Sequence, residues 1–297
     1  MVIVNRYKFI LNPIAGGGRA KSMMPVIERY FQEAKLEYEI YQTSKQQDAI
    51  GAARRAAEEG FNIVVAAGGD GTVNEVLNGI VGSDAALAVI HGGKGNDFAL
   101  SVNMPKDTEA ACRALEKAAI KKIDLGKVLD RHFINSVGVG FDATVASRVN
   151  RGIKPLNGVY AYIYAVFETL LTYRPIEMEI ELGDGRKFTQ KPMLVAVGIG
   201  CSYGGGMMIL PNAIQDDGLL DICVLDQMNN LALAYHFPKV FSGKHVKLKE
   251  AALYRSEEIT LRLSEKCPLH MEGEILISDQ MHFTIEKQAM PVVFGGL

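Results

Sequence analysis

The hydrophobic pattern of the first part of the chain alternates between strand-like and helix-like segments up to about residue 125. Residues 62–67 form a continuous, largely β-branched apolar run, as expected for a strand covered on both faces, and residues 22–34 carry apolar side chains at helical spacing. The same criteria predict strands at 8–11, 38–41 and 86–90 and helices at 48–59, 74–80 and 108–119. Strands that alternate with helices predict a parallel sheet with helices on both faces.

The pattern changes after about residue 126. Short stretches of alternating polar and apolar residues appear, separated by turn-forming Gly and Asp residues at 183–185 and 216–218. The alternating stretches are 177–181, 219–225, 258–263 and 282–286. This pattern is typical of an antiparallel β-sandwich, interrupted by one helix at 159–172. The chain is therefore expected to contain an α/β domain followed by a mostly-β domain, with a site between them.

Composition narrows the classes of protein. The chain has 297 residues, of which 48% are hydrophobic and 22% charged, with a formal net charge of -2. A nucleic-acid partner is not expected, because such domains are usually strongly basic. The four cysteines are too far apart in sequence for a zinc or redox pair, which favours a reducing compartment. No signal-peptide or membrane-spanning run is seen, so we expect a cytoplasmic protein that meets membranes only peripherally.

Three glycine-rich loops, 12–18, 68–72 and 92–97, each follow a predicted strand. Glycine permits positive φ and lets backbone amides approach a phosphate, and a helix that begins after such a loop adds its dipole. One loop alone could be a simple tight turn. Three at successive strand ends, with Asp70 and Asp97 beside them, favour a polyphosphate site with Mg²⁺.

Two motif-like segments carry less weight. Residues 15–22 approach the Walker A pattern, but alanine stands at both obligatory glycine positions, so only a phosphate contact by Arg19 or Lys21 stays open. Residues 138–143 fit G-x-G-x-x-A, but no strand followed by an acid lies about 20 residues further on. A tight turn into a helix is the better interpretation of this second segment.

At these loops the sequence resembles the bacterial diacylglycerol kinases and their relatives, the sphingosine and ceramide kinases. The resemblance starts from Gly68–Glu75, which reads GGDGTVNE, and from Asn12-Pro13. It extends through 133–143 and is most specific at 203–221. It covers about residues 7–276. The GGDGT loop by itself is also present in NAD kinases and phosphofructokinases, so the motifs of the second half discriminate.

The resemblance implies an α/β nucleotide-binding domain at 1–126, rejoined by the last residues 288–297, and a β-sandwich domain on the lipid side at 127–287. ATP would bind in the cleft between them. By position, the resemblance implies that the following residues contact the nucleotide: Asn12, Pro13, Ile14, Ala15, Gly16, Thr43, Gly68, Gly69, Gly71, Thr72, Val73, Asn74, Glu75 and Lys94.

The resemblance also implies catalytic residues. The acceptor of the hydroxyl proton is Glu274 or, less favoured, Glu272, and Asp70 helps to hold Mg²⁺. A further Mg²⁺ site would use Asp217 with the backbone carbonyls of Ile214 and Leu219. From the residues alone, 272–274 could equally be a solvent-facing hairpin turn.

Two residues depart from the pattern of the family. Glu272 stands where the family has Asp, which moves the carboxylate by roughly 1.5 Å, a displacement that can cost about a hundredfold in rate. Lys94 replaces a threonine and adds a cation near the phosphates.

We therefore expect an ATP-dependent kinase that phosphorylates the hydroxyl of diacylglycerol or a similar lipid at the membrane surface; a homodimer is left open. The helix at 159–172 could line an acyl-chain groove or be a buried core helix. The basic run Lys239, Lys244, Lys247 and Lys249 could meet anionic headgroups or be a solvated face. The alternatives are a kinase with a non-lipid acceptor such as NAD, and a catalytically weakened nucleotide-binding regulator.

Overall fold

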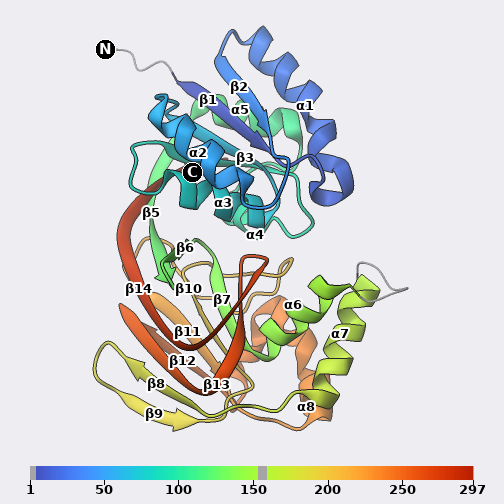
Figure 1. Cartoon of the computed structure of the whole chain (residues 1–297), viewed down its shortest axis with the longest axis vertical. Coiled ribbons are helices and arrows are strands. Elements are labelled where there is room, and N and C mark those ends of the chain that lie inside the picture. Colours follow the sequence, from blue (N-terminus) through green and yellow to red (C-terminus); the bar gives the residue numbers. More distant parts are fainter. Residues whose placement is uncertain (1–4, 153–158, 297) are drawn as a thin grey trace. The chain divides into compact units, whose positions relative to one another are not determined.

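The computed structural model describes residues 5–152 and 159–296, and the chain divides into two compact units (Figure 1). The first unit comprises Met1–Leu125 with Glu286–Leu297, and the second comprises Gly126–Ile285. The division expected from the sequence was 1–126 with 288–297 against 127–287. The long strand β14 (Glu274–Phe294) contributes residues to both units.

The first unit is built on a parallel sheet in the order β2-β1-β3-β4, completed by the end of β14. Its strands are β1 (Arg6–Leu11), β2 (Glu37–Gln42), β3 (Ile63–Gly68) and β4 (Ala86–His91), followed by β5 (Ala119–Val128). Its helices are α1 (Ala15–Glu33), α2 (Asp48–Glu58), α3 (Asp70–Ile80), α4 (Asp97–Ser101) and α5 (Thr108–Lys117).

The central strands β3 and β4 are buried along their whole length, because helices cover both faces of the sheet. Helix α1 packs with α5, and α2 packs with α3. The last pair lies very close: a Cβ added to Gly79 of α3 would lie 2.5 Å from the carbonyl oxygen of Ile50 in α2. The predicted α/β arrangement with a parallel sheet is thus confirmed.

Helix α1 differs from the prediction at its start. It was expected to begin at residue 22, and its bounds are Ala15–Glu33. Gly16, Gly17 and Gly18 have φ of 60°, 73° and 96°, so regular helical geometry begins only after them. These three residues with positive φ join the first glycine loop directly to the helix. The periodicity of apolar residues could not reveal this, because glycine has no side chain.

The second unit is an antiparallel assembly in the order β12-β11-β10-β7-β13-β14, with β8 beside β13 and β9 beside β8. Its strands are β6 (Arg131–Phe133), β7 (Ser136–Gly140), β8 (Met178–Leu182), β9 (Lys187–Gln190), β10 (Leu194–Gly198), β11 (Leu220–Leu225), β12 (Ala251–Ser256) and β13 (Glu258–Met271). Its helical segments are α6 (Phe141–Arg151), α7 (Val159–Thr172), α8 (Asn230–His236), η1 (Phe237–Ser242) and η2 (Lys244–Lys247).

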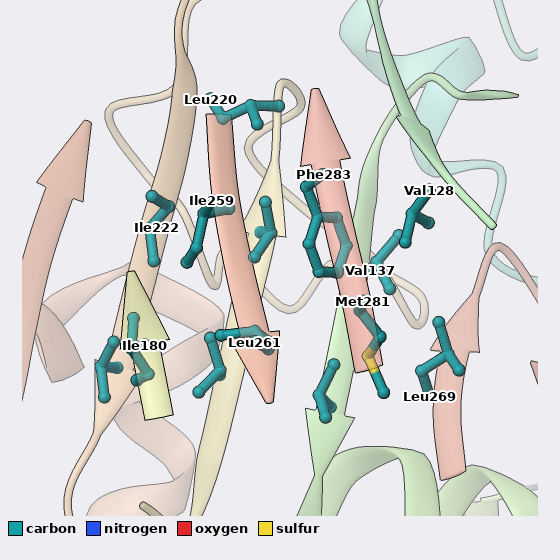
Figure 2. Packing of buried hydrophobic residues seen from close by; sticks show 14 of the residues in the cluster. Val128, Val137, Ile180, Leu220, Ile222, Ile259, Leu261, Leu269, Met281 and Phe283 are labelled. Carbon is teal, nitrogen blue, oxygen red and sulfur yellow. The ribbon is translucent and has the colours of Figure 1, made fainter. Parts of the chain in front are cut away.

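The strands of this unit serve two cores, because successive side chains point to opposite faces. On β10, Val195 and Val197 join the core between the strands, whereas Leu194 and Ala196 join a second core under the helices. Figure 2 shows side chains of several strands, including Ile180, Leu261 and Phe283, meeting in the first core. This confirms the predicted β-sandwich domain.

Helix α7 combines features of both readings of 159–172. Ala165, Val166 and Leu170 are buried in the second core, whereas Phe167 and Leu171 are 58% and 79% exposed. The side chains of 159–163 lie outside the described residues. The helix is therefore a core helix on one side and an apolar surface on the other.

The core of the second unit supports a prediction on stability. Phe283 of β14 is fully buried and packs edge-on against Phe133 at 6.3 Å between ring centroids. We expect Phe283→Ala to lower the free energy of unfolding by about 3–5 kcal/mol, because it leaves a cavity that the neighbouring strands cannot fill. Urea unfolding followed by circular dichroism measures this change.

The matched control lies on the same strand. Ile277 is 68% exposed, so Ile277→Ala should change the free energy of unfolding by no more than about 0.5 kcal/mol. Equal losses in the two variants would show that the packing in Figure 2 does not stabilise the unit.

Candidate active site

The three glycine-rich loops lie against one another at the carboxyl ends of β1, β3 and β4. The amide of Gly92 donates to the carbonyl of Gly68 at 2.9 Å. A Cβ added to Gly16 would lie 2.4 Å from the carbonyl oxygen of Gly92, and one on Gly93 would lie 2.4 Å from the Cα of Gly69. Backbone approaches of this kind require glycine. They concentrate the amides of three loops at one edge of the sheet, which is what a polyphosphate needs.

Asn12 connects the first loop to the second. Its amide donates to the carbonyl of Ala67 at 3.1 Å, and its Nδ2 donates to Oγ1 of Thr72 at 3.4 Å. Its Oδ1 accepts from the amide of Ile14 at 3.3 Å, which shapes the turn that contains Pro13 and Ala15. These bonds hold the loop of β1 beside the N-terminus of α3.

Some of the residues predicted to contact the nucleotide already form contacts within the protein. The carboxylate of Glu75 accepts from the amides of Gln47 and Ala49 at 3.0 and 3.1 Å, so it satisfies the N-terminus of α2. Val73 is buried in the core of the unit, so only its backbone is available to a nucleotide. Thr43 is held through its amide, which donates to the carbonyl of Leu11 at 2.9 Å. Their contact with the nucleotide stays a prediction.

Two carboxylates lie together beside the loops. Asp70 begins α3, and its Oδ1 accepts from the amide of Phe98 at 3.1 Å, in the first turn of α4. Burial foremost, and then the charge of Asp97, raises the pKa of Asp70. A cation at this position would relieve both effects. Within the described residues no group of three His, Cys, Asp or Glu side chains could hold a metal by itself, but Mg²⁺ typically binds to one or two carboxylates together with substrate phosphates.

The predicted acids Glu272 and Glu274 belong to a tight hairpin between β13 and β14: Glu272 lies in the turn and Glu274 begins β14. Met271 pairs with Glu274, and the two turn residues Glu272 and Gly273 have φ of 50° and 95°, as a type I′ turn requires. Glu272 is only 4% exposed, and its Oε1 accepts from the amides of Ile134 and Asn135 at 2.6 and 2.7 Å. A hairpin turn was one reading of these residues, but Glu272 does not face solvent. Its carboxylate instead holds the turn against the β6–β7 connection.

Two further side chains, missed in the sequence, hold the same turn. Arg131 of β6 forms an ion pair with Glu274 and fixes the orientation of its carboxylate. His270 accepts at Nε2 from the amide of Gly273 at 3.1 Å, and burial lowers the pKa of His270 to about 4, so the ring is neutral as this bond requires. Neither residue shows a distinctive spacing, because their contact with the turn arises only from strand pairing.

Comparison with known proteins identifies the family. Residues 6–128 match the diacylglycerol kinase catalytic domain, and residues 135–294 match the YegS C-terminal NAD kinase beta sandwich-like domain. The diacylglycerol kinase of Bacillus subtilis (strain 168) is 31% identical over 274 residues, which cover 91% of this chain and 90% of that protein. The diacylglycerol kinase of Staphylococcus carnosus (strain TM300) is 29% identical over 271 residues, covering 91% and 88%.

The chain belongs to the diacylglycerol kinase family. As a member it is an enzyme, an ATP-dependent lipid kinase. A crystal structure of a candidate diacylglycerol kinase from Bacillus anthracis str. Sterne matches with a TM-score of 0.79 at 25% identity, covering 98% of this chain and 97% of that one.

The second unit of the kinase contains an apolar cavity of about 70 Å³ between its strands and helices. Apolar side chains line most of it: Phe141, Val145, Val166, Leu194, Met207, Ile209, Leu225, Met228, Leu233, Phe237, Val240 and Leu248. In its wall, the hydroxyl of Tyr203 donates to Oδ2 of Asp142 at 2.6 Å, and burial raises the pKa of Asp142. Asp142 lies so close to Gly138 that a Cβ there would overlap it. The sequence favoured a tight turn into a helix at 138–143; residues 138–140 instead end β7, and the chain passes directly into α6 at Gly140, whose φ is 108°.

At the predicted second metal site, the carboxylate of Asp217 already has partners within the protein. Oδ1 of Asp217 accepts from the amide of Leu219 at 3.1 Å, and its carboxylate forms an ion pair with Arg255 of β12. Ile214 is 49% exposed. A cation at Asp217 would have to displace the Arg255 guanidinium, so this role stays a prediction.

The loop contacts predict which glycine matters for nucleotide binding. Both Gly16 and Gly17 have positive φ, but a Cβ on Gly17 meets nothing within 4 Å, whereas one on Gly16 meets the third loop. We expect Gly16→Ala to weaken binding of a fluorescent ATP analogue at least tenfold, about 1.4 kcal/mol. The matched variant Gly17→Ala shares the backbone strain and should stay within about threefold of the wild type. Equal losses in both variants would mean that strain, and not contact between loops, sets the affinity.

The lowered pKa of His270 predicts that the stability of the protein depends on pH. Its pKa of about 4 in the folded protein lies below the ordinary value of about 6.5, so the unfolded chain binds the proton first as the pH falls. Stability should therefore be complete above about pH 6.5 and decrease toward pH 4. Between pH 7 and pH 5 we expect this group to contribute roughly 1 kcal/mol, discounted for the partial exposure of the ring.

The control replaces His270 by glutamine, which cannot take up a proton in this pH range and still offers a hydrogen-bond acceptor. His270→Gln should flatten the loss of stability between pH 7 and pH 5, as measured by urea unfolding at both values. An unchanged difference between the two pH values would contradict a neutral His270 ring in the folded protein.

Proposed function

We propose that this kinase transfers the γ-phosphoryl group of ATP to the hydroxyl of diacylglycerol or a similar lipid, with Mg²⁺ as the cofactor. The observation that carries the choice of acceptor is the apolar cavity in the second unit. Relatives that are about 30% identical over 90% of the chain carry the name diacylglycerol kinase, which supports the same acceptor.

The chemistry of the cavity favours an acyl chain over a dinucleotide. Ribose and phosphate groups lose hydrogen bonds with water when they enter a protein and must find polar partners there. Most of the lining is apolar, and its polar side chains are Asp142, Tyr203, His236 and His245. The hydroxyl of Tyr203 is already bonded to Asp142, and Nε2 of His245 is bonded to the carbonyl of Ile209. At about 70 Å³ the cavity is smaller than typical ligand pockets, so it accommodates the end of an acyl chain and not a whole lipid.

The first unit would bind the nucleotide. Amides of the first two loops, at Gly16 and Gly69, would hold the phosphates of ATP, whereas the amide of Gly93 in the third loop already donates to Oδ1 of Asn96 at 2.8 Å. Asp70 would bind Mg²⁺, which would neutralise charge on the phosphates. Lys94 is exposed on the third loop and would add a cation for the same phosphates. Binding and charge neutralisation account for most of the catalysis in phosphoryl transfer.

Glu274 would act as the base. As the lipid oxygen forms its bond to the γ-phosphorus, the bond from that phosphorus to the bridging oxygen of ADP breaks, and the hydroxyl proton passes to Glu274. Glu272 is a positioning residue in this scheme, since its Oε1 already accepts from two amides. Glu272 departs from the family's Asp, but the acid at 274 is present in this chain.

The two acids can be separated by mutation. Glu274→Gln should lower kcat by about 10²–10⁴ and leave ATP affinity unchanged, because it removes only the proton acceptor. Glu272→Gln keeps a carbonyl oxygen for the amides of Ile134 and Asn135, so it should retain more activity than Glu274→Gln. Turnover with labelled ATP, together with nucleotide binding, measures both; full activity of Glu274→Gln would remove Glu274 from the role of base.

Incubation with labelled ATP, with and without Mg²⁺, and a panel of diacylglycerol, sphingosine, phosphatidylglycerol and NAD tests the acceptor. Label in phosphatidic acid that requires Mg²⁺ supports the proposal. Label in NADP would establish the alternative acceptor, and ATP binding without transfer to any acceptor would indicate a regulator.

A further inference from the structure

The segment 229–249, here called the docking segment, has two different apolar faces. Its inner side chains Leu233, Phe237 and Val240 line the cavity of the second unit. On the other side Leu231 and Tyr235 of α8 are 85% and 75% exposed. They stand four residues apart, on one face of the helix, and Phe241 of η1 is also exposed.

The inner face is firmly attached to the rest of the unit. The amide of Met208 donates to the carbonyl of Val240 at 3.0 Å, and Nε2 of His245 bonds to the carbonyl of Ile209 at 3.0 Å. A Cβ on Gly243 would lie 2.7 Å from Cβ of Pro211. The outward direction of Leu231 and Tyr235 is therefore set by a well-bonded segment and does not result from loose packing.

The charge of the segment is one-sided. Between residues 227 and 249 the sequence contains Lys239, Lys244, Lys247 and Lys249 and no acidic residue. Lys249 lies 3.8 Å from the carboxylate of the next residue, Glu250. Nζ of Lys239 lies 5.7 Å from the centroid of the exposed Tyr235 ring. Exposed aliphatic and aromatic side chains next to lysines are typical of segments that lie in the interface of an anionic bilayer.

We infer that the outer face of the docking segment binds the surface of a bilayer that contains anionic phospholipid. Leu231 and Tyr235 enter the interfacial layer, and the lysines attract the headgroup phosphates. Within the described residues no helix is both long and apolar enough to cross a membrane. The inner face of the segment lines the cavity assigned to the acceptor lipid, so docking would bring a wall of that cavity to the bilayer. This consequence rests on the proposed function, whereas binding of the docking segment to the bilayer does not.

Sedimentation with vesicles tests the binding without any substrate. We expect the wild-type enzyme to bind phosphatidylcholine vesicles that contain phosphatidylglycerol, and to bind pure phosphatidylcholine roughly tenfold more weakly. The variant Leu231→Ser/Tyr235→Ser should lose binding to both by roughly tenfold. The variant Lys239→Gln/Lys244→Gln/Lys247→Gln/Lys249→Gln should lose only the preference for phosphatidylglycerol, as should the wild type at about 0.5 M salt.

Ile120→Ser is the matched control, because Ile120 is 48% exposed in the first unit, and it should bind vesicles as the wild type does. The inference would be overturned if Leu231→Ser/Tyr235→Ser bound vesicles as well as the wild type does. It would also be overturned if light scattering showed that this variant has a different oligomeric state, which would assign this face to a second copy of the chain. Activity on a dispersed short-chain diacylglycerol should persist in both docking variants. If no lipid were phosphorylated by any of the proteins, the proposed function would fail while the vesicle result still stood.

Discussion

The close approach of glycine backbones at the ends of β1, β3 and β4 is the constraint on which the nucleotide half of this kinase depends. Gly16, Gly68 and Gly69 meet Gly92 and Gly93 at distances where a Cβ would overlap. A parallel sheet brings these strand ends to one edge, and glycine allows the loops to close over it. The amides proposed to bind phosphate are thus brought together by the backbone and not by charged side chains, so this arrangement does not depend on the net charge of the chain, which is -2.

Buried carboxylates in both units are held by backbone amides. Asp70 accepts from the amide of Phe98, and Glu272 accepts from the amides of Ile134 and Asn135. Taking a carboxylate out of water is costly unless hydrogen bonds replace the lost hydration. The same bonds determine geometry: one carboxylate ties α3 to α4, and the other holds the hairpin turn beside Glu274. Each acid therefore contributes to the position of the groups around it as well as to charge.

The second unit uses one set of strands for two purposes. Because side chains alternate along β10 and β11, Val195 and Ile222 complete the sandwich core, whereas Ala196 and Cys223 support the helical layer. The apolar cavity lies in that helical layer, under the docking segment. The region proposed to face lipid thus lies outside the sandwich core and does not interrupt it.

The sequence by itself determined the fold class and the position of three glycine-rich loops at the ends of strands. Alternation of strand and helix periodicity indicated the parallel sheet, and the glycines were visible at successive strand ends, because both signals are local. The residues alone left a hairpin turn at 272–274 open, and the resemblance implied Glu274 as the proton acceptor. Only the tertiary structure decided the roles of Glu272, Glu75, Arg131 and His270. The partners of these residues lie on other elements and are brought close by strand pairing or helix packing. Local spacing in the sequence therefore cannot distinguish an acid that caps a helix or holds a turn from one that is available to accept a proton.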